Sequence, residues 1–523
     1  MTQIKRALIS CTDKTGIPEL AKFLVEQNIE ILSTGGTAKI LQDNNIPVTE
    51  VSDYTQSPEI LDGRLKTLHP KIHGGILAIR QNKNHQKQMA ENNINPIDLI
   101  IVNLYEFEKT ISKENCQLDD AIENIDIGGP TMLRSAAKNY KDVAVVVDPS
   151  DYDELKKQIQ QGELTIPFKF KLATKVFQKT ANYDTAIIRY LQSKLPSTDA
   201  TNSKFNPNLQ LNLTKVQDLR YGENPHQKAA LYKDESVSTG IVNANQLQGK
   251  ELSFNNILDL ESAYNCCKEF KQPACVIVKH LNPCGVAIAE NSNEAFIRAR
   301  AGDPVSCFGG IVAINQPVNK QTALLIAETF FEAIIAPAFE PEALDIFAKK
   351  KNLRLMTLNN FSANEDSLDY RRVGGGLLIQ DFDNQIIPMS EAKVVTKRQP
   401  TKQELIDLDF AWHVVKHVKS NAIVLTKESQ SIGVGAGQMS RVDSVKLAGL
   451  KAKEYFKDPQ TFKNVAMGSD AFFPFRDGID QAAQFGVTAI VQPGGSMRDN
   501  EVIEACDEHG ITMLCTGMRH FRH

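Results

Sequence analysis

One adjacent pair of side chains, Lys279 and His280, has the residue types that acyl transfer requires. The pair follows an apolar run at 275–278 and precedes the segment NPCG at 282–285. A neutral imidazole can take a proton from an attacking amine, while an ammonium group stabilises the oxyanion that develops on the carbonyl. The neighbouring charge of Lys279 also favours the neutral imidazole that a base requires. The pair predicts acyl-type transfer at a strand end; a structural histidine is the alternative.

Two loops near the N-terminus have the composition of phosphate-binding turns. Residues 30–45 are expected to form a strand, the turn STGGT at 33–37, and a helix. Glycines let the backbone approach a ligand, and a helix N-terminus offers unpaired N–H groups to a phosphate. A second strand-to-helix loop at 10–15 adds hydroxyl groups and Lys14. Because ligands of open α/β sheets bind beyond the strand carboxyl ends, the loops favour a phosphate pocket over a capped tight turn.

Two further segments carry charges suited to an anionic ligand. The segment DGRLKTLHP at 62–70 holds Arg, Lys and His within six residues, although a solvated basic turn is the alternative. The segment IDIGGPT at 125–131 leads into an expected helix with Arg134 and Lys138, which lie four residues apart on one helix face. An anionic ligand or Asp126 would offset the repulsion between these two cations.

Motifs typical of several other enzyme classes are absent from the sequence. The segment GVGAG at 433–437 lacks the spacing of a dinucleotide fingerprint, and no Walker-type lysine loop occurs. His413 and His417 lie four residues apart, but Val414 replaces the glutamate of a zinc-protease motif. No Cys-x-x-Cys or His-x-Glu occurs, so zinc-deaminase chemistry has neither its ligands nor its general acid/base. We therefore expect no metal requirement.

Composition limits the class of protein further. The 523 residues include 42% hydrophobic and 23% charged residues, as in a soluble globular protein of several domains. A net charge of −4 argues against a nucleic-acid partner. No long apolar run predicts a membrane span or an export signal. Nine cysteines, an odd number, favour reduced thiols in the cytoplasm over a disulfide framework.

Strand-length and helix-length patterns alternate in the first 150 residues. Short β-branched or leucine-rich runs predict strands at 7–11, 30–34, 99–104 and 143–148, and helical patterns lie at 17–28 and 37–45. Such alternation indicates a largely parallel sheet covered by helices. Two more helices are expected at 151–161 and 170–194.

A polar, proline-containing segment at 193–208 is the best candidate for a linker, and an internal repeat follows it. Segments 274–290 and 421–437 both read as strand, polar turn, strand. Segments 333–356 and 489–514 both read as strand, proline, loop, helix, strand. The order and separation of the two pairs predict two related α/β subdomains, with chance resemblance as the alternative.

These motifs, in this order and across essentially the whole chain, resemble the bifunctional AICAR transformylase/IMP cyclohydrolase family of purine biosynthesis. The matching segments are SCTDK at 10–14, STGGT at 33–37, GRLKTLHP at 63–70, IDIGG at 125–129, RYGENPHQ at 220–227, VKHLNPCG at 278–285, SNAIV at 420–424, GAGQMSR at 435–441, SDAFFPFRDG at 469–478 and RHFRH at 519–523. The resemblance implies a cyclohydrolase domain at 1–199 with a methylglyoxal-synthase-like sheet. It also implies a transformylase domain at 200–523, built from two cytidine-deaminase-like subdomains without zinc.

In the first domain the resemblance implies ring closure of formyl-AICAR to IMP. Residues matching those implicated in that step are Lys66, Tyr105, Asp126 and Lys138, the last as proton donor and acceptor. Positions that match the family's nucleotide-binding residues are Thr12, Asp13, Lys14, Thr34, Gly35, Gly36, Thr37, Arg64, Thr67, Asn103 and Ile127. One departure is Glu106, which stands in place of a proline and adds a negative charge beside Tyr105.

In the second domain the resemblance implies formyl transfer from 10-formyltetrahydrofolate to AICAR. His280 would be the base and Lys279 would stabilise the tetrahedral oxyanion. Positions that match AICAR-binding or site-shaping residues are Arg220, Tyr221, Gly309, Asn421, Arg441, Phe472, Asp477 and Arg519, and Ser496 and Met497 match folate-contacting positions. A homodimer with transformylase sites across its interface is also implied. The rival hypotheses are a nucleotide deaminase or other zinc hydrolase, and a non-enzymatic nucleotide-binding protein on the same folds.

Overall fold

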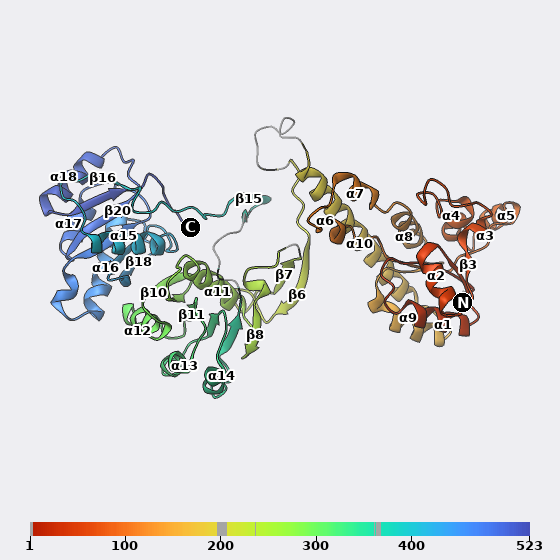
Figure 1. Ribbon diagram of the computed structural model, residues 1–523, viewed down its shortest axis with the longest axis horizontal. Helices are drawn as coiled ribbons and strands as arrows, with labels where there is room; N and C mark the ends of the chain where they lie inside the picture. Colours follow the sequence, from red (N-terminus) through yellow and green to blue (C-terminus); the bar gives the residue numbers. More distant parts are fainter. Residues whose placement is uncertain (1–3, 196–204, 206, 236, 360, 362–367) are drawn as a thin grey trace. The chain divides into compact units, whose positions relative to one another are not determined.

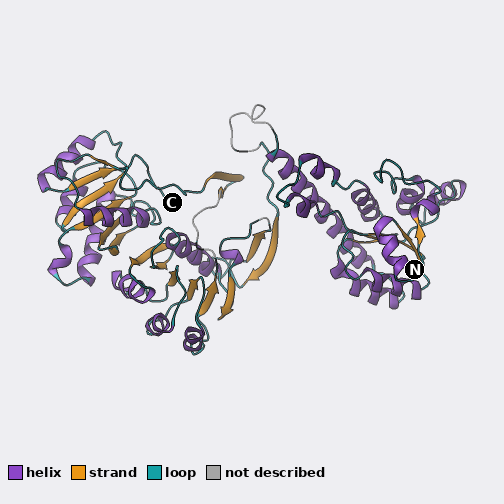
Figure 2. Ribbon diagram, in the orientation of Figure 1, coloured by secondary structure: helices purple, strands orange, loops and turns teal. Residues whose placement is uncertain are grey.

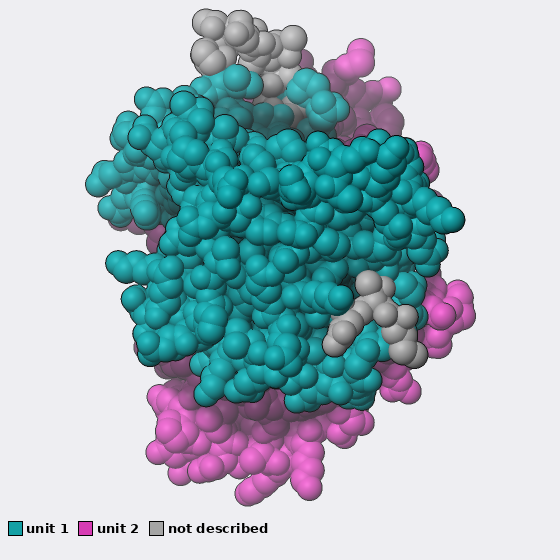
Figure 3. Space-filling model, turned by 90° about the vertical axis from the view of Figure 1, so that its right-hand side faces the viewer, with its two compact units in different colours: residues 1–212 teal, residues 213–523 magenta. Residues whose placement is uncertain are grey.

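The computed structural model describes the chain except for residues 1–3, 196–204, 206, 236, 360 and 362–367. It contains two compact units, Met1–Asn212 and Leu213–His523, which Figure 3 colours separately. The centre of the expected linker, including the expected boundary between residues 199 and 200, lies outside the described residues.

Unit 1 is built on a parallel sheet of five strands in the order β3-β2-β1-β4-β5. The strands are β1 (Arg6–Ser10), β2 (Glu30–Ser33), β3 (Thr49–Glu50), β4 (Leu99–Val102) and β5 (Ala144–Val146). The predicted parallel sheet is therefore confirmed, and four of its strands overlap the predicted runs, although β1 begins one residue earlier than predicted. The short strand β3 was not predicted, because two residues are too few to show a strand pattern.

Helices cover both faces of this sheet (Figures 1 and 2). They are α1 (Ile17–Glu26), α2 (Gly35–Asp43), α3 (Val51–Thr55), α4 (Pro70–Leu77), α5 (Lys83–Glu91), α6 (Phe107–Ile111), α7 (Leu118–Glu123), α8 (Gly128–Lys138), α9 (Tyr152–Gln160) and α10 (Ile166–Ser193). Successive strand residues point to opposite faces. In β1, Ile9 packs in a core with α1 and α9, whereas Leu8 packs in a second core with α4 and α8. Burial of both faces explains the nearly continuous apolar runs of these strands.

Unit 2 is built on a mixed sheet of twelve strands. In spatial order they are β16 (Lys393–Val394), β21 (Thr512–Cys515), β20 (Val487–Gln492), β19 (Val465–Ser469), β17 (Ile423–Lys427), β18 (Gln430–Gly435), β10 (Asn282–Ile288), β9 (Ala274–Lys279), β11 (Ile311–Ile314), β12 (Ala333–Ala336), β13 (Arg354–Thr357) and β8 (Asn245–Gln248). Two separate hairpins accompany it, β6 (Leu213–Leu219) with β7 (Ala229–Asp234) and β14 (Leu368–Val373) with β15 (Gly376–Asp381).

The two halves of this sheet repeat each other strand by strand. The order β10-β9-β11-β12-β13-β8 has the same parallel and antiparallel pairings as β18-β17-β19-β20-β21-β16. The predicted internal repeat is therefore confirmed. The halves meet where β10 pairs antiparallel with β18, with Ala287 opposite Gln430. Equivalent turns of the two halves consequently lie at opposite ends of the strands, and so at opposite edges of the sheet.

One core is shared by both halves of unit 2. Helices α11 (Phe254–Cys267) and α15 (Lys402–Val415) lie over one sheet face and contribute to the same apolar cluster, which includes the fully buried Trp412. The other face is covered separately in each half, by α12 (Ser292–Gly302), α13 (Lys320–Ala327) and α14 (Pro341–Phe347), and by α16 (Arg441–Tyr455), α17 (Asp477–Ala483) and α18 (Asp499–His509). The shared core makes the two halves a single folded body.

Within the described ranges, no helix combines the length and the apolar character that crossing a membrane needs.

The folding of unit 1 generates the first prediction. Its two cores lie entirely within the first 212 residues, so a fragment of residues 1–199 should fold alone. We expect one cooperative thermal transition, measured by circular dichroism, and an α/β spectrum. A soluble full-length chain alongside an insoluble or non-cooperative fragment would show that the boundary is misplaced.

Candidate active sites

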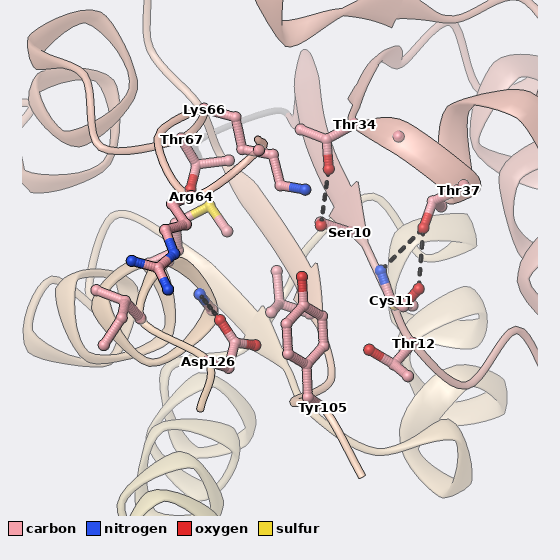
Figure 4. Close-up of a pocket in the computed structure, with 18 of the residues that line it drawn as sticks. Ser10, Cys11, Thr12, Thr34, Thr37, Arg64, Lys66, Thr67, Tyr105 and Asp126 are labelled. Carbon is pink, nitrogen blue, oxygen red and sulfur yellow. Dashed lines mark hydrogen bonds between the residues drawn. The ribbon is translucent and has the colours of Figure 1, made fainter. Parts of the chain in front are cut away.

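A cavity of about 680 Å³ lies at the edge of the unit 1 sheet where its parallel strands end (Figure 4). The loops after β1, β2 and β4 meet there because parallel strands present their carboxyl ends at one edge. The residues predicted from the sequence that line it are Thr12, Lys14, Thr34, Gly35, Gly36, Thr37, Arg64, Lys66, Thr67, Asn103, Tyr105, Asp126 and Ile127. The N-termini of α2 and α8 also face this cavity, since Gly35 and Gly128 line it.

Hydroxyl groups join the first two loops of the cavity. The hydroxyls of Ser10 and Thr34 lie 3.0 Å apart. The Thr37 hydroxyl accepts the N–H of Cys11 at 3.1 Å and donates to the Cys11 carbonyl at 3.0 Å, as the dashed lines in Figure 4 show. Gly35 has a φ of 47°, in the left-handed region that favours glycine. These contacts join the STGGT turn to the loop after β1 and fix the N-terminus of α2, where an anion could bind, at the cavity.

Asn103 ties the β4 end to the loop after β1. Its side-chain oxygen accepts the N–H of Thr12 at 2.5 Å and of Asp13 at 3.0 Å, and its nitrogen donates to the Asp13 carbonyl at 2.8 Å. Lys14 donates to the Cys11 carbonyl. Of the loop residues predicted to bind nucleotide, Asp13 alone is absent from the cavity lining; its carboxylate instead bonds Thr15.

Asp126 is the acidic group best placed for proton transfer. Burial raises the pKa of its carboxyl, opposed by the N–H of Gly129 at 2.8 Å and by the charge of Lys66. A carboxyl with a raised pKa works closer to neutral pH as an acid or base. The Lys66 ammonium and the Tyr105 hydroxyl point into the same open space (Figure 4). The cavity therefore combines an ammonium, a phenol and a carboxyl whose pKa is raised.

Arg64 and Glu106 each form an ion pair with another charged side chain. Arg64 forms an exposed ion pair with Glu123, so a phosphate entering here must compete with a carboxylate. The unusual Glu106 lies 2.9 Å from the ammonium of Lys109, and both side chains are exposed. Because Lys109 neutralises Glu106 and water screens it, its charge opposes an anionic ligand only weakly.

Lys138 is not brought to this cavity. It is exposed at the C-terminal end of α8, whereas Gly128, Gly129 and Met132 of that helix line the cavity. The ends of an eleven-residue helix are separated by about 15 Å. The sequence pattern placed Lys138 on a helix face but could not show which end of the helix meets the ligand.

A second cavity, of about 640 Å³, lies in the first half of unit 2. Five of the predicted residues line it: Arg220, Tyr221, Lys279, His280 and Gly309. Residues that the sequence analysis missed also line it, among them Asn256, Glu332 and Arg354. Arg354 donates to the Glu332 carboxylate at 2.7 Å. These residues stand in segments with no distinctive local pattern, and only the sheet brings them together.

Lys279 and His280 lie where β9 turns into β10. The Lys279 ammonium donates to the Phe308 carbonyl at 2.7 Å. A Cβ at Gly309 would lie 3.0 Å from that ammonium, and Gly309 has a φ of 70°, so glycine suits this position on two grounds. His280 is exposed, in a turn where it and Leu281 both have positive φ. An imidazole and a held ammonium thus face one cavity.

The predicted residues of the second half do not line this cavity but share its sheet edge. Strand register places the start of β17 and the ends of β18, β19 and β20 at the edge where β9 ends. Asn421, Phe472, Asp477, Ser496 and Met497 belong to segments at these strand ends. Lys419 donates its N–H to Asn282 at 2.9 Å, which joins the two halves at this edge.

Arg441 is buried instead of being open to a ligand. It donates to Asp470 at 2.6 Å and to the Asn421 side chain at 2.7 Å. Phe472 is partly exposed and Met497 fully exposed, whereas Arg519 lies over the ring of Phe521. A ligand would reach Arg441 only if this buried pair opened.

Comparison with known proteins decides the family. Residues 136–451 match the family model described as AICARFT/IMPCHase bienzyme, and residues 16–131 match that of the MGS-like domain. The chain belongs to the AICARFT/IMPCHase bienzyme family. This bienzyme catalyses formyl transfer to AICAR with a folate co-substrate and the IMP cyclohydrolase reaction of purine biosynthesis.

The fold agrees with this assignment. The MGS-like match falls within the parallel-sheet unit, and the bienzyme match extends from α8 into α16 of the mixed α/β unit.

A solved structure entitled "Crystal structure of ForH" is similar to part of this chain. The sequences are 33% identical over a match that covers 36% of this chain and 97% of the solved chain, and the TM-score is 0.34.

The geometry of the first cavity generates a prediction for the bienzyme. Lys66→Ala removes the ammonium that faces Asp126, so conversion of formyl-AICAR to IMP should fall at least about tenfold, with formyl transfer nearly intact. Lys138→Ala should also lower IMP formation if the family role of this residue holds. Both rates can be followed separately by absorbance.

A matched control is Lys141→Ala, which changes a nearby lysine that does not line the first cavity. Wild-type cyclisation in Lys66→Ala would remove this residue from the mechanism. If cyclisation is normal in Lys138→Ala but lowered in Lys66→Ala, the cavity residues would carry the reaction and Lys138 would not be the proton donor and acceptor.

Proposed function

We propose that unit 1 closes formyl-AICAR to IMP in its cavity, and that unit 2 transfers a formyl group from 10-formyltetrahydrofolate to AICAR at Lys279 and His280. The domains would be residues 1–199 and 200–523. The observation that carries the proposal is the pairing of a held ammonium with an exposed imidazole at one strand end, in a chain whose family performs formyl transfer.

Ring closure in unit 1 is intramolecular. The carboxamide nitrogen of formyl-AICAR attacks its own formyl carbon, a C–N bond forms, and the former formyl oxygen leaves as water. Well-oriented intramolecular reactions reach effective molarities of ~10⁵ M or more. The protein therefore needs mainly to bind the folded substrate and move protons, and this favours a reaction without a metal.

The cavity residues divide between binding and chemistry. The loops at 12–14, 34–37 and 64–67, with Asn103 and Ile127, would hold the nucleotide, its phosphate beside the α2 N-terminus. Asp126 would exchange a proton with the reacting carboxamide, and Lys66 and Tyr105 would stabilise charge on the formyl oxygen. Lys138 stays a family-based candidate for proton transfer.

Formyl transfer in unit 2 requires help at two atoms. The 5-amino group of AICAR is a weak nucleophile because its lone pair is delocalised. As it attacks the formyl carbon, positive charge develops on nitrogen and negative charge on oxygen. His280 would take the amine proton, and Lys279 would meet the oxyanion. Collapse of the tetrahedral intermediate then expels the folate nitrogen, which leaves as tetrahydrofolate after protonation.

The second half of unit 2 would complete the site in a homodimer. Asn421, Arg441, Phe472, Asp477 and Arg519 are proposed to bind AICAR or shape its site, and Ser496 and Met497 to contact folate. Support comes from the exposed apolar side chains at this sheet edge, including Met439, Phe475 and Met497. We also propose a cytoplasmic location, supported by nine free cysteines and by small-molecule substrates of purine metabolism.

The catalytic role of His280 generates the next prediction. General-base catalysis contributes about 10²–10⁴-fold, so His280→Ala should lower the transformylase kcat at least about a hundredfold. Because His280 would react and not anchor substrate, KM for AICAR should change little. Cyclisation of supplied formyl-AICAR should stay near wild type, which controls for folding. A variant that keeps more than about a tenth of kcat would contradict the assignment.

A further inference from the structure

The turn that carries His280 is a strained two-residue connection. His280 has a φ of 51° and Leu281 a φ of 65°, in the left-handed region that non-glycine residues rarely adopt. This conformation suits the tight turn of an antiparallel hairpin, whose twist it matches. Neither residue is Asn or Gly, the residues that favour such turns, so surrounding contacts must hold it.

Those contacts come mainly from α11, which packs beneath the hairpin. The Asp259 carboxylate accepts the N–H of Leu281 at 2.7 Å, and the Ser262 hydroxyl donates to the Leu281 carbonyl at 2.8 Å. Arg522 donates to that hydroxyl at 3.2 Å, so the C-terminal segment supports the same contact. Side chains therefore bind both the backbone N–H and the backbone carbonyl of Leu281.

The second half of unit 2 contains the same carboxylate-to-turn contact. In α15 the Asp407 carboxylate accepts the N–H of Ser429 at 2.7 Å, across the same separation of 22 residues. Glu428 and Ser429 have φ values of 51° and 56°. Burial raises the pKa of both Asp259 and Asp407, opposed by the turn N–H groups. The contact is thus a duplicated feature of the repeat.

The lysine before each turn is duplicated as well. Lys427 donates to the Gln460 carbonyl at 2.6 Å, as Lys279 donates to the Phe308 carbonyl at 2.7 Å. The turn residue that follows the lysine differs, since His280 stands where the second half has Glu428. The antiparallel pairing of β10 with β18 puts the two turns at opposite sheet edges. Only the turn with the histidine faces the cavity lined by Lys279 and Gly309.

We propose that Asp259 is a positioning residue for formyl transfer: its carboxylate fixes the left-handed turn that directs the His280 imidazole into the cavity. The proposal rests on His280 being the base. In both halves an aspartate carboxylate stabilises a hairpin turn. In the first half that turn carries His280, the proposed base. A displacement of about 1 Å at such a base can cost about 10²-fold in rate.

The test compares equivalent substitutions in the two halves of the full-length bienzyme. Asp259→Ala removes the acceptor, whereas Asp259→Asn keeps a carbonyl oxygen for the Leu281 N–H. Asp407→Ala removes the equivalent acceptor at the opposite sheet edge and serves as the matched control. For each variant, and for His280→Ala, we would measure the transformylase kcat, KM for AICAR, cyclisation of formyl-AICAR and the melting temperature.

We expect Asp259→Ala to lower the transformylase kcat roughly 10- to 100-fold, with KM for AICAR and cyclisation near wild type. Asp259→Asn should recover most of kcat, and Asp407→Ala should lower the melting temperature about as much as Asp259→Ala while retaining kcat. A normal kcat in Asp259→Ala, no recovery in Asp259→Asn, or an equal loss in Asp407→Ala would each overturn the positioning role. If His280→Ala itself keeps its kcat, the catalytic assignment fails, and the positioning role fails with it.

Discussion

Strand direction is the constraint on which both sites depend. In unit 1 all strands are parallel, so the loops after β1, β2 and β4 must open at one edge and their polar residues converge. In unit 2 the antiparallel pair of β10 and β18 reverses the second half relative to the first. That reversal brings the end of β9 to the edge where β18, β19 and β20 also end. If either strand pairing changed, cavity residues that are far apart in the sequence would no longer lie close together.

The reversal also separates the two equivalent turns: the turn with His280 lies at the cavity, and the turn with Glu428 lies at the other end of the strands. Each half presents a lysine and a strained turn held by an aspartate, at Lys279 and Asp259 and again at Lys427 and Asp407. The duplicated contacts stabilise hairpins wherever they occur. In the proposed function, formyl transfer takes place at the turn that carries His280, where the surrounding strands leave a cavity. The difference between the two turns would then be a change of residue type on a repeated structural element.

Much of this arrangement could be predicted from the sequence, because it depends on local patterns. Apolar runs identified four of the five strands of unit 1, and residues 34–37 of the STGGT turn lie at the cavity as expected. The placement of Lys138 could not be predicted, since a helix face does not reveal which helix end meets a ligand. The burial of Arg441 against Asp470 could not be predicted either, because Asp470 is 29 residues away and follows a different strand. Glu332 and Asp259 were missed for the same reason: their roles come from the sheet and helix packing and not from neighbouring residues.

In the proposed function, two separate cavities carry out two consecutive reactions on one substrate. The measurement that tests it most directly supplies the full-length bienzyme with AICAR and 10-formyltetrahydrofolate and follows tetrahydrofolate and IMP separately. We expect tetrahydrofolate to appear first and IMP to follow after a lag, with equal final amounts. Adding excess IMP, which should occupy the unit 1 cavity, would lengthen the lag and leave the initial rate of tetrahydrofolate release unchanged. Inhibition of both reactions to the same degree by IMP would contradict the account, because it would mean that a single site serves both steps.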